Sequence, residues 1–224
     1  MENAVSYAIK NDFYLVENLI EEDAFLKKAL ETTRENNLPE MEVSSAHGKF
    51  LYLLAKIKNA SRILELGTYC GYSTIWLAKA LSSGNGIIKT IECNETYANI
   101  AQKNIKNAGL QNKVKILRGD AAELLNKLIL EKEEPFDMIF IDADKLNYPK
   151  YLELSLQLST SGTIIYGDNV LRGGKLSNVS NPDSRGEGVR KFIEDLGKTK
   201  TLESTVLQTV GIKGFDGFSL SIVK

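Results

Sequence analysis

The part of the sequence that most constrains the fold is a regular alternation that begins at Arg62. Short, mostly apolar runs alternate with longer segments whose apolar residues recur at helical spacing. Runs that are apolar throughout are typical of strands buried on both faces of a parallel sheet, so an α/β fold with right-handed crossovers is predicted. The predicted strands are Arg62–Leu66, Ile87–Ile91, Val114–Leu117, Met138–Ile141 and Thr163–Tyr166; the predicted helices are Thr74–Leu81, Thr96–Ala108, Ala121–Leu130 and Tyr148–Leu158.

Each predicted strand is followed by an acid or a glycine. In an open parallel sheet, ligands bind outside the carboxyl ends of the strands. Acids that merely end strands in solvent would explain one such position, but they explain five in succession poorly. Two of the strands are the most informative, because adjacent parallel strands would bring the oxygens of Asp142, Asp168 and Asn169 together, close to Lys145. The strand ends are Glu65–Gly67, Glu92, Gly119–Ala121, Asp142–Lys145 and Asp168–Asn169.

The regions outside the alternation complete a single domain over residues 1–224, with N-terminal helices in 1–58 and a Rossmann-like core in 62–224. Apolar residues at helical spacing before Leu38 predict a helix that Asp23 caps, and a second helix begins at Ser44 or Ser45. Two β-rich runs, 201–210 and 215–223, predict a closing antiparallel hairpin. Glycines and polar residues in 171–188 predict a mobile loop over the site.

Composition removes several classes of function. The net charge is −1, which gives no electrostatic argument for nucleic acid or an anionic membrane. No run approaches the ~20 apolar residues of a membrane span, and no signal peptide is recognisable. Cys70 and Cys93 form no disulfide framework, so a cytoplasmic location is expected. The single histidine, His47, argues against a Ser-His-Asp triad and a zinc site, and we interpret it as an ordinary surface or helix-end residue.

The turn after the first strand indicates the class of cofactor. Gly67 and Gly71 let the backbone pass close to a ligand, but the middle glycine of a dinucleotide-binding turn and the lysine of a P-loop are missing. Glu65 would repel phosphates and attract a cation. This pattern favours S-adenosylmethionine, which carries an ammonium and a sulfonium, over NAD or ATP. Glu92 is placed to accept both ribose hydroxyls, and Gly119–Ala121 would lie near the adenine.

The segment 63–74 resembles motif I of class I S-adenosylmethionine-dependent methyltransferases. Together with 140–145 and 167–169, it resembles the cation-dependent O-methyltransferases, which include catechol and caffeoyl-CoA O-methyltransferases and bacterial relatives. The resemblance implies a Rossmann-like sandwich with a mostly parallel seven-stranded sheet and an antiparallel C-terminal strand. It implies metal ligands at Asp142, Asp168 and Asn169, and cofactor contacts at Val43, Glu65, Gly67, Thr68, Ser73, Glu92, Ala121 and Asp142.

The predicted reaction follows from these ligands. Three hard oxygens suit magnesium, and also manganese or calcium. The cation would lower the pKa of an acceptor hydroxyl. Lys145 is the candidate general base, and the resulting oxyanion would attack the sulfonium methyl group without a covalent enzyme intermediate. Asp144 has two open interpretations, namely contact with cofactor or acceptor, or capping of the following helix.

Several acceptors and partners remain compatible with the sequence. The leading hypothesis is a vicinal-diol aromatic acceptor of catechol, flavonoid or caffeoyl type, and the alternative is a hydroxylated nucleoside (hydroxyuridine) in tRNA. A dehydrogenase is disfavoured by the missing glycine, and a non-catalytic regulator would leave Asp142, Asp168 and Asn169 unexplained. The first 40 residues would form a lid, a dimer contact or core packing; we expect a homodimer and no membrane partner.

Overall fold

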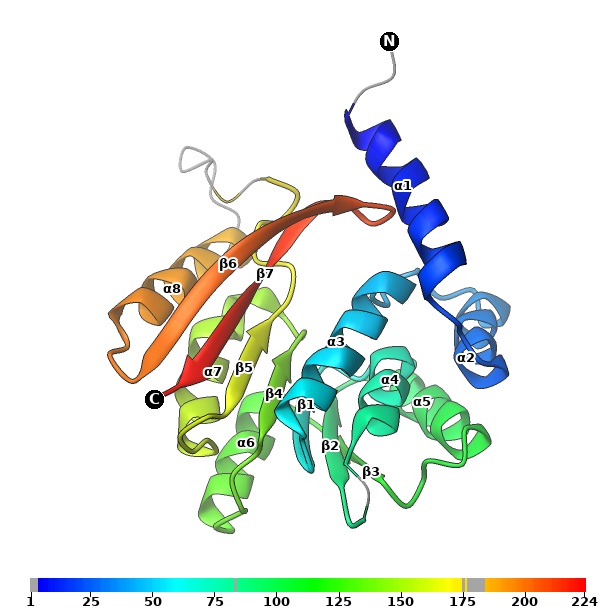
Figure 1. Ribbon diagram of the computed structural model, residues 1–224. Coiled ribbons are helices and arrows are strands. Elements are labelled where there is room, and N and C mark those ends of the chain that lie inside the picture. Colours follow the sequence, from blue (N-terminus) through cyan, green and yellow to red (C-terminus); the bar gives the residue numbers. More distant parts are fainter. Residues whose placement is uncertain (1–3, 83, 175, 177–183) are drawn as a thin grey trace.

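The computed structural model describes residues 4–82, 84–174, 176 and 184–224. Within these residues the strands form one sheet in the order β3-β2-β1-β4-β5-β7-β6 (Figure 1). Strands β1 to β5 run parallel, β7 pairs antiparallel with β5, and β6 pairs antiparallel with β7. This confirms the mostly parallel seven-stranded sheet with an antiparallel C-terminal strand. The strands are β1 Arg62–Leu66, β2 Ile87–Glu92, β3 Val114–Arg118, β4 Met138–Ile141, β5 Ile164–Gly167, β6 Leu202–Gly211 and β7 Gly214–Val223.

Helices cover both faces of the sheet, as predicted, because side chains alternate between the faces along each strand. In β4, Met138 and Phe140 join the core cluster under α3 and α4, whereas Ile139 and Ile141 join the cluster under α6, α7 and α8. The helices are α1 Ala4–Leu19, α2 Ala24–Glu35, α3 Ser45–Lys58, α4 Tyr72–Ala80, α5 Glu95–Asn107, α6 Ala121–Leu130, the 3₁₀ turn η1 Lys145–Asn147, α7 Tyr148–Gln157 and α8 Ser184–Lys198.

Helices α2 and α3 begin where the sequence predicted. The Asp23 side chain accepts hydrogen bonds from the backbone amides of Phe25 and Leu26, both at 3.0 Å, at the start of α2. Ser44 caps α3 by accepting from the His47 amide at 3.2 Å. Helix α1 packs beside the turn of the β6–β7 hairpin (Figure 1).

The prediction of a loop over 171–188 is wrong in its last part, because α8 begins at Ser184. Val189, Phe192 and Leu196 recur at helical spacing and are buried against the sheet. Their packing stabilises the helix, although the glycines in its sequence favour a loop. A Cβ on Gly188 would lie 2.2 Å from the Lys145 carbonyl oxygen, so glycine is needed for α8 to approach η1. Residues 175 and 177–183 of the predicted loop lie outside the described residues.

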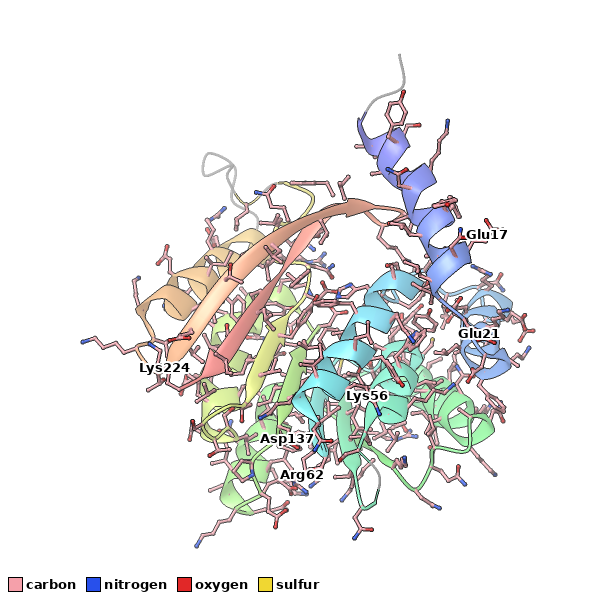
Figure 2. All side chains as sticks on the ribbon, in the orientation of Figure 1. Glu17, Glu21, Lys56, Arg62, Asp137 and Lys224 are labelled. Carbon is pink, nitrogen blue, oxygen red and sulfur yellow. The ribbon has the colours of Figure 1, made fainter. Side chains whose placement is uncertain are left out.

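The amino ends of the strands carry well-paired charges. Asp137 Oδ2 accepts hydrogen bonds from the Ser61 amide (2.7 Å), the Ser61 hydroxyl (3.0 Å) and the Arg62 amide (2.9 Å). Glu133 accepts from both Arg62 and Lys89. Figure 2 shows Arg62 and Asp137 at the same edge of the sheet. Hydrogen bonds and ion pairs therefore connect the strands at this edge, which lies opposite the predicted site.

Among the residues described, we find no helix with the length and apolar character that crossing a bilayer requires.

Candidate active site

A cavity of about 700 Å³ lies at the carboxyl ends of β1, β2, β3 and β4. Its volume is in the range of cofactor and drug-sized ligand sites. Seven of the eight side chains predicted to contact the cofactor line it, and only Glu65 does not. The predicted residues in its wall are Val43, Gly67, Thr68, Ser73, Glu92, Ala121 and Asp142.

Glu65 is fully buried beneath this cavity. Its carboxylate accepts hydrogen bonds from the hydroxyls of Ser73 (2.6 Å), Thr74 (2.5 Å) and Thr90 (2.6 Å). Burial raises the pKa of Glu65 to about 7 in spite of these three donors. The Ser73 hydroxyl is therefore turned toward Glu65 and does not cap α4, whose N-cap residue is Gly71. Direct contact between Glu65 and a cofactor stays a prediction.

Gly67 joins the first turn to the end of β4. Its φ angle is 98°, in the left-handed region, and a Cβ there would lie 2.1 Å from the Asp142 carbonyl oxygen. The Asp142 amide donates to the Leu66 carbonyl at 2.8 Å. Any side chain at position 67 would push these two segments apart, so glycine holds the first turn against Asp142.

Glu92 is fixed at the end of β2 by two backbone amides. One carboxylate oxygen accepts from Tyr69 and the other from Asn94, both at 2.8 Å. Each oxygen keeps a second lone pair for a ligand hydroxyl. The rings of Tyr69 and Tyr97 pack edge to face at 4.8 Å between centroids and also line the cavity. Sequence reasoning missed both tyrosines: Tyr69 lies within the segment 63–74 but was assigned no contact, and Tyr97 belongs to no motif.

A second cavity, of about 580 Å³, lies on the other side of Asn169. Asp168 and Asn169 form one end, and the aromatic rings of His47, Phe50 and Phe218 line it. The hairpin turn between β6 and β7 and Asp12 of α1 form the far wall. The two cavities share a wall made of Met41, Glu42, Val43, Asn169 and Arg172.

The predicted metal ligands meet where the two cavities adjoin. Residues Ile141 and Gly167 are paired in adjacent strands, so Asp142 and Asp168 follow the same point of the sheet edge. Asn169 has a φ angle of 54°, a left-handed conformation that asparagine tolerates better than most residues. The backbone amide of Asn169 donates a hydrogen bond to Asp168 Oδ1 at 2.8 Å.

The charges at this point favour a cation. Asp168 is buried, and burial together with the negative charge of Asp142 raises the pKa of Asp168 to about 8, although Lys145 opposes this shift. The described residues contain no group of three or more His, Cys, Asp or Glu side chains arranged to hold a metal. The predicted set consists of two carboxylates and an amide, and these hard oxygens fit magnesium, manganese or calcium better than zinc.

Lys145 is buried beside the same residues. Its Nζ donates to Asp142 Oδ1 at 2.9 Å and to the Tyr148 hydroxyl at 2.6 Å. Tyr148 is fully buried, and burial raises the pKa of its phenol well above the usual range, so the phenol keeps its proton. The Tyr148 hydroxyl lies 2.9 Å from the Ile141 carbonyl and 2.8 Å from the Asp168 carbonyl. Lys145 is therefore held at a defined position at the ends of β4 and β5.

The chain matches a known protein family. The sequence model of a family described as O-methyltransferase matches residues 16–221. The chain belongs to the O-methyltransferase family. This membership confirms the predicted resemblance and the predicted class of enzyme.

Individual relatives of this O-methyltransferase match over nearly their whole length. A catechol O-methyltransferase of Niastella koreensis is 45% identical over 95% of this chain and 96% of its own. The solved structure of an O-methyltransferase from Bacillus cereus in complex with SAH has a TM-score of 0.95 and 45% identity, and it covers 98% of this chain and 100% of its own. The structure of TomG from Streptomyces achromogenes, an O-methyltransferase involved in tomaymycin synthesis in complex with SAM, has a TM-score of 0.95 and 39% identity, with 100% of both chains covered.

His47 of this O-methyltransferase lies in the first turn of α3, which agrees with the helix-end interpretation, but its ring is largely buried and not at the surface. The ring lies in the second cavity, with Nε2 2.6 Å from the Tyr166 hydroxyl and Nδ1 3.8 Å from Asp168 Oδ2. Burial lowers the pKa of His47 to about 4, so the ring is neutral near pH 7. No sequence signal could have found this contact, because it joins α3 to the end of β5.

Asp144 serves the capping role that the sequence left open, and it also lines the first cavity. Its side chain accepts from the Asn147 amide at 3.3 Å at the start of η1 and from the Tyr151 hydroxyl. The two interpretations of Asp144 are therefore compatible in this O-methyltransferase.

Proposed function

We propose that this O-methyltransferase transfers the methyl group of S-adenosylmethionine to one hydroxyl of a vicinal diol on an aromatic acceptor. The observation that carries the proposal is the meeting of two cavities at Asp142, Asp168 and Asn169, beside the buried Lys145. One cavity has the size for a nucleoside cofactor, and the other has an aromatic lining for the acceptor. The catechol O-methyltransferase name of a relative that matches over nearly the whole chain supports this acceptor class.

We assign the first cavity to S-adenosylmethionine, and the SAH and SAM bound to two solved relatives support this. Glu92 would accept hydrogen bonds from the ribose hydroxyls through its remaining lone pairs. Ser73 and Thr68 would contact the methionine part, with Val43 and Ala121 packing against the ligand. Glu65 would act through Ser73, because its carboxylate holds that hydroxyl and does not line the cavity.

We assign Asp142, Asp168 and Asn169 to a magnesium ion, with manganese or calcium as substitutes. The donor set and the raised pKa of Asp168, caused by burial and by the charge of Asp142, support a cation at this point. When bound there, a divalent cation lowers the pKa of an acceptor hydroxyl. Asp142 would serve both the cation and the cofactor, because its side chain lines the first cavity.

Lys145 is the proposed general base. Asp142 and Tyr148 hold its Nζ beside the proposed metal ligands, where a general base would lie close to the acceptor hydroxyl. With Lys145 in its neutral amine form, the proton of the acceptor hydroxyl passes to Nζ, and the oxygen attacks the methyl carbon. The carbon–sulfur bond breaks as the carbon–oxygen bond forms, and the sulfonium becomes the neutral thioether of S-adenosylhomocysteine.

We further propose a homodimer and a cytoplasmic location. Helix α1 exposes several large apolar side chains, and the exposed fractions are 57% for Tyr7, 67% for Tyr14 and 71% for Leu19. Exposed apolar residues that lie together are typical of contacts between subunits. Cys70 and Cys93 are both free, which agrees with a reducing compartment. Sedimentation of the purified protein tests the dimer, because a single species with the mass of one chain would contradict it.

The activity is tested by a screen with labelled S-adenosylmethionine against catechols, flavonoids, caffeoyl-CoA and unmodified tRNA. We expect methylation of a catechol that stops in excess EDTA and returns on addition of magnesium. Full activity in excess chelator would contradict the metal site. Labelling of tRNA alone would replace the diol acceptor by the hydroxylated nucleoside.

A further inference from the structure

His47 occupies a rigid position at the start of α3. The Ser44 side chain caps the helix by accepting from the His47 amide at 3.2 Å. The next residue, Gly48, packs so closely on α4 that a Cβ there would lie 2.4 Å from the Trp76 ring. The backbone under the His47 side chain is therefore fixed by a cap and by helix packing.

The ring of His47 spans two residues of one strand end. Tyr166 and Asp168 are two residues apart, so their side chains leave β5 on the same face. Nε2 of His47 lies 2.6 Å from the Tyr166 hydroxyl, and Nδ1 faces Asp168 Oδ2 at 3.8 Å. The second distance is longer than a hydrogen bond, so the contact of Nδ1 with Asp168 is electrostatic in this structure.

The two oxygens of Asp168 have different neighbours. Oδ1 accepts from the Asn169 amide at 2.8 Å, and Oδ2 faces His47. A neutral imidazole carries one proton on its two nitrogens, and the partner of one nitrogen decides where the proton lies. The Tyr166 hydroxyl lies within hydrogen-bond distance of Nε2, and in the tautomer in which this hydroxyl donates to Nε2 the imidazole proton is on Nδ1, toward Asp168.

We propose that His47 is a positioning residue, whose Nδ1–H orients the carboxylate of Asp168 for cation binding while the Tyr166 hydroxyl holds the ring in the required tautomer. This inference rests on the proposed function, because it assumes that Asp168 is a metal ligand. Groups that hydrogen-bond to a ligating carboxylate typically contribute 10- to 100-fold in metal affinity or activity. His47 thereby extends the site from the sheet edge into the N-terminal helices.

The test is the affinity of the intact protein for Mn²⁺, measured without cofactor or acceptor from the electron paramagnetic resonance signal of the free ion. His47→Ala is expected to raise the Kd for Mn²⁺ about tenfold. His47→Asn keeps a donor at the position of Nδ1 and is expected to restore most of the affinity. His47→Gln places its amide at the position of Nε2, so it is expected to behave like alanine. Tyr166→Phe is expected to have a smaller effect of about threefold.

Leu53→Ala is the control, because Leu53 lies on the same helix, is exposed and lines neither cavity. Its Mn²⁺ affinity should equal that of the wild type. Binding of S-adenosylhomocysteine to every variant reports that the fold and the first cavity are intact. An Ala variant within twofold of the wild type, or a Gln variant that recovers better than the Asn variant, overturns the role of Nδ1. A wild type that binds no Mn²⁺ overturns the proposed metal site as well.

Discussion

The two edges of the sheet differ in how their carboxylates are paired. At the amino ends of the strands, Glu133 accepts hydrogen bonds from Arg62 and Lys89, and Asp137 accepts from the backbone amide of Ser61. At the carboxyl ends, Glu65 and Asp168 are buried without such a set of cationic or amide partners. Burial raises the pKa of Glu133, but Lys89 and Arg62 outweigh it and the pKa falls below its usual value; backbone amides have the same effect on Asp137. Burial dominates at the other edge, so the pKa rises to about 7 for Glu65 and to about 8 for Asp168.

This difference indicates that the amino-end edge contributes to stability and the carboxyl-end edge to binding. A carboxylate with complementary partners favours the folded state, whereas a buried carboxylate without a full set of them costs stability at neutral pH. Perturbed carboxylates of the second kind gather at functional sites. Here they lie beside both cavities, and the well-paired carboxylates lie at the opposite edge.

The largest effect should come from Asp168→Asn. We expect kcat/KM for a catechol to fall about 10³-fold, since a charged ligand of the proposed cation is lost. The melting temperature of the metal-free protein should rise, because the cost of burying the Asp168 carboxyl group and its repulsion with Asp142 are removed. Steady-state kinetics and calorimetry measure the two changes. A variant with unchanged turnover would remove Asp168 from the site.

Lys145→Ala should lower kcat about 10²-fold, because a general base is removed. Binding of S-adenosylhomocysteine should stay within threefold of the wild type, since the cofactor site is proposed to depend on other side chains. Single-turnover kinetics and calorimetric titration separate the two effects. Lys150→Ala is the control, because Lys150 pairs with Glu153 on the surface of α7. Equal turnover in the two variants would contradict the role of Lys145.

Glu65→Gln should change the pH dependence of stability. The folded-state pKa of Glu65 is raised from 4.5 to about 7, so its contribution to stability is present below the unfolded value and is lost as pH rises through about 7. Between about pH 5 and pH 8 this loss amounts to roughly 2 kcal/mol. We expect denaturant unfolding to show a flatter pH profile for the Gln variant. Parallel profiles for the two proteins would show that Glu65 does not titrate in this range.

Asp137→Asn should have the smallest effect and sharpen the comparison from the opposite edge. Replacing the charged acceptor of three hydrogen bonds should cost about 1 kcal/mol, which corresponds to a fall of about 2–4 °C in melting temperature. Catalysis should be unchanged at a temperature where both proteins are folded. A loss of turnover without a loss of stability would mean that the two edges are not separate in function.

Much of the fold was predictable, because burial imposes a clear pattern on strands and helices. Strands β1 and β4 and helix α6 have the predicted bounds. Helix α8 was missed, because Gly186 and Gly188 lower local helix propensity and its stability comes from packing. The prediction of one domain over residues 1–224 stays a prediction.

The site was predictable where chemistry depends on a strand end. Seven predicted cofactor residues line one cavity because the carboxyl ends of parallel strands meet at one edge. The buried position of Glu65 was not predictable, since it depends on hydroxyls from α4 and β2 that close over it. His47 and the walls of the second cavity come from segments distant in sequence, so no local pattern records them.

The far wall of the second cavity can vary separately from the proposed chemistry. It is built where Asp12 of α1 accepts a hydrogen bond from the Ile212 amide in the β6–β7 turn, at 2.7 Å. These residues stand near opposite ends of the chain, and neither belongs to the segments that carry the proposed chemistry. Changes in the terminal helix or in the hairpin turn would therefore reshape the second cavity without replacing Asp142, Asp168, Asn169 or Lys145.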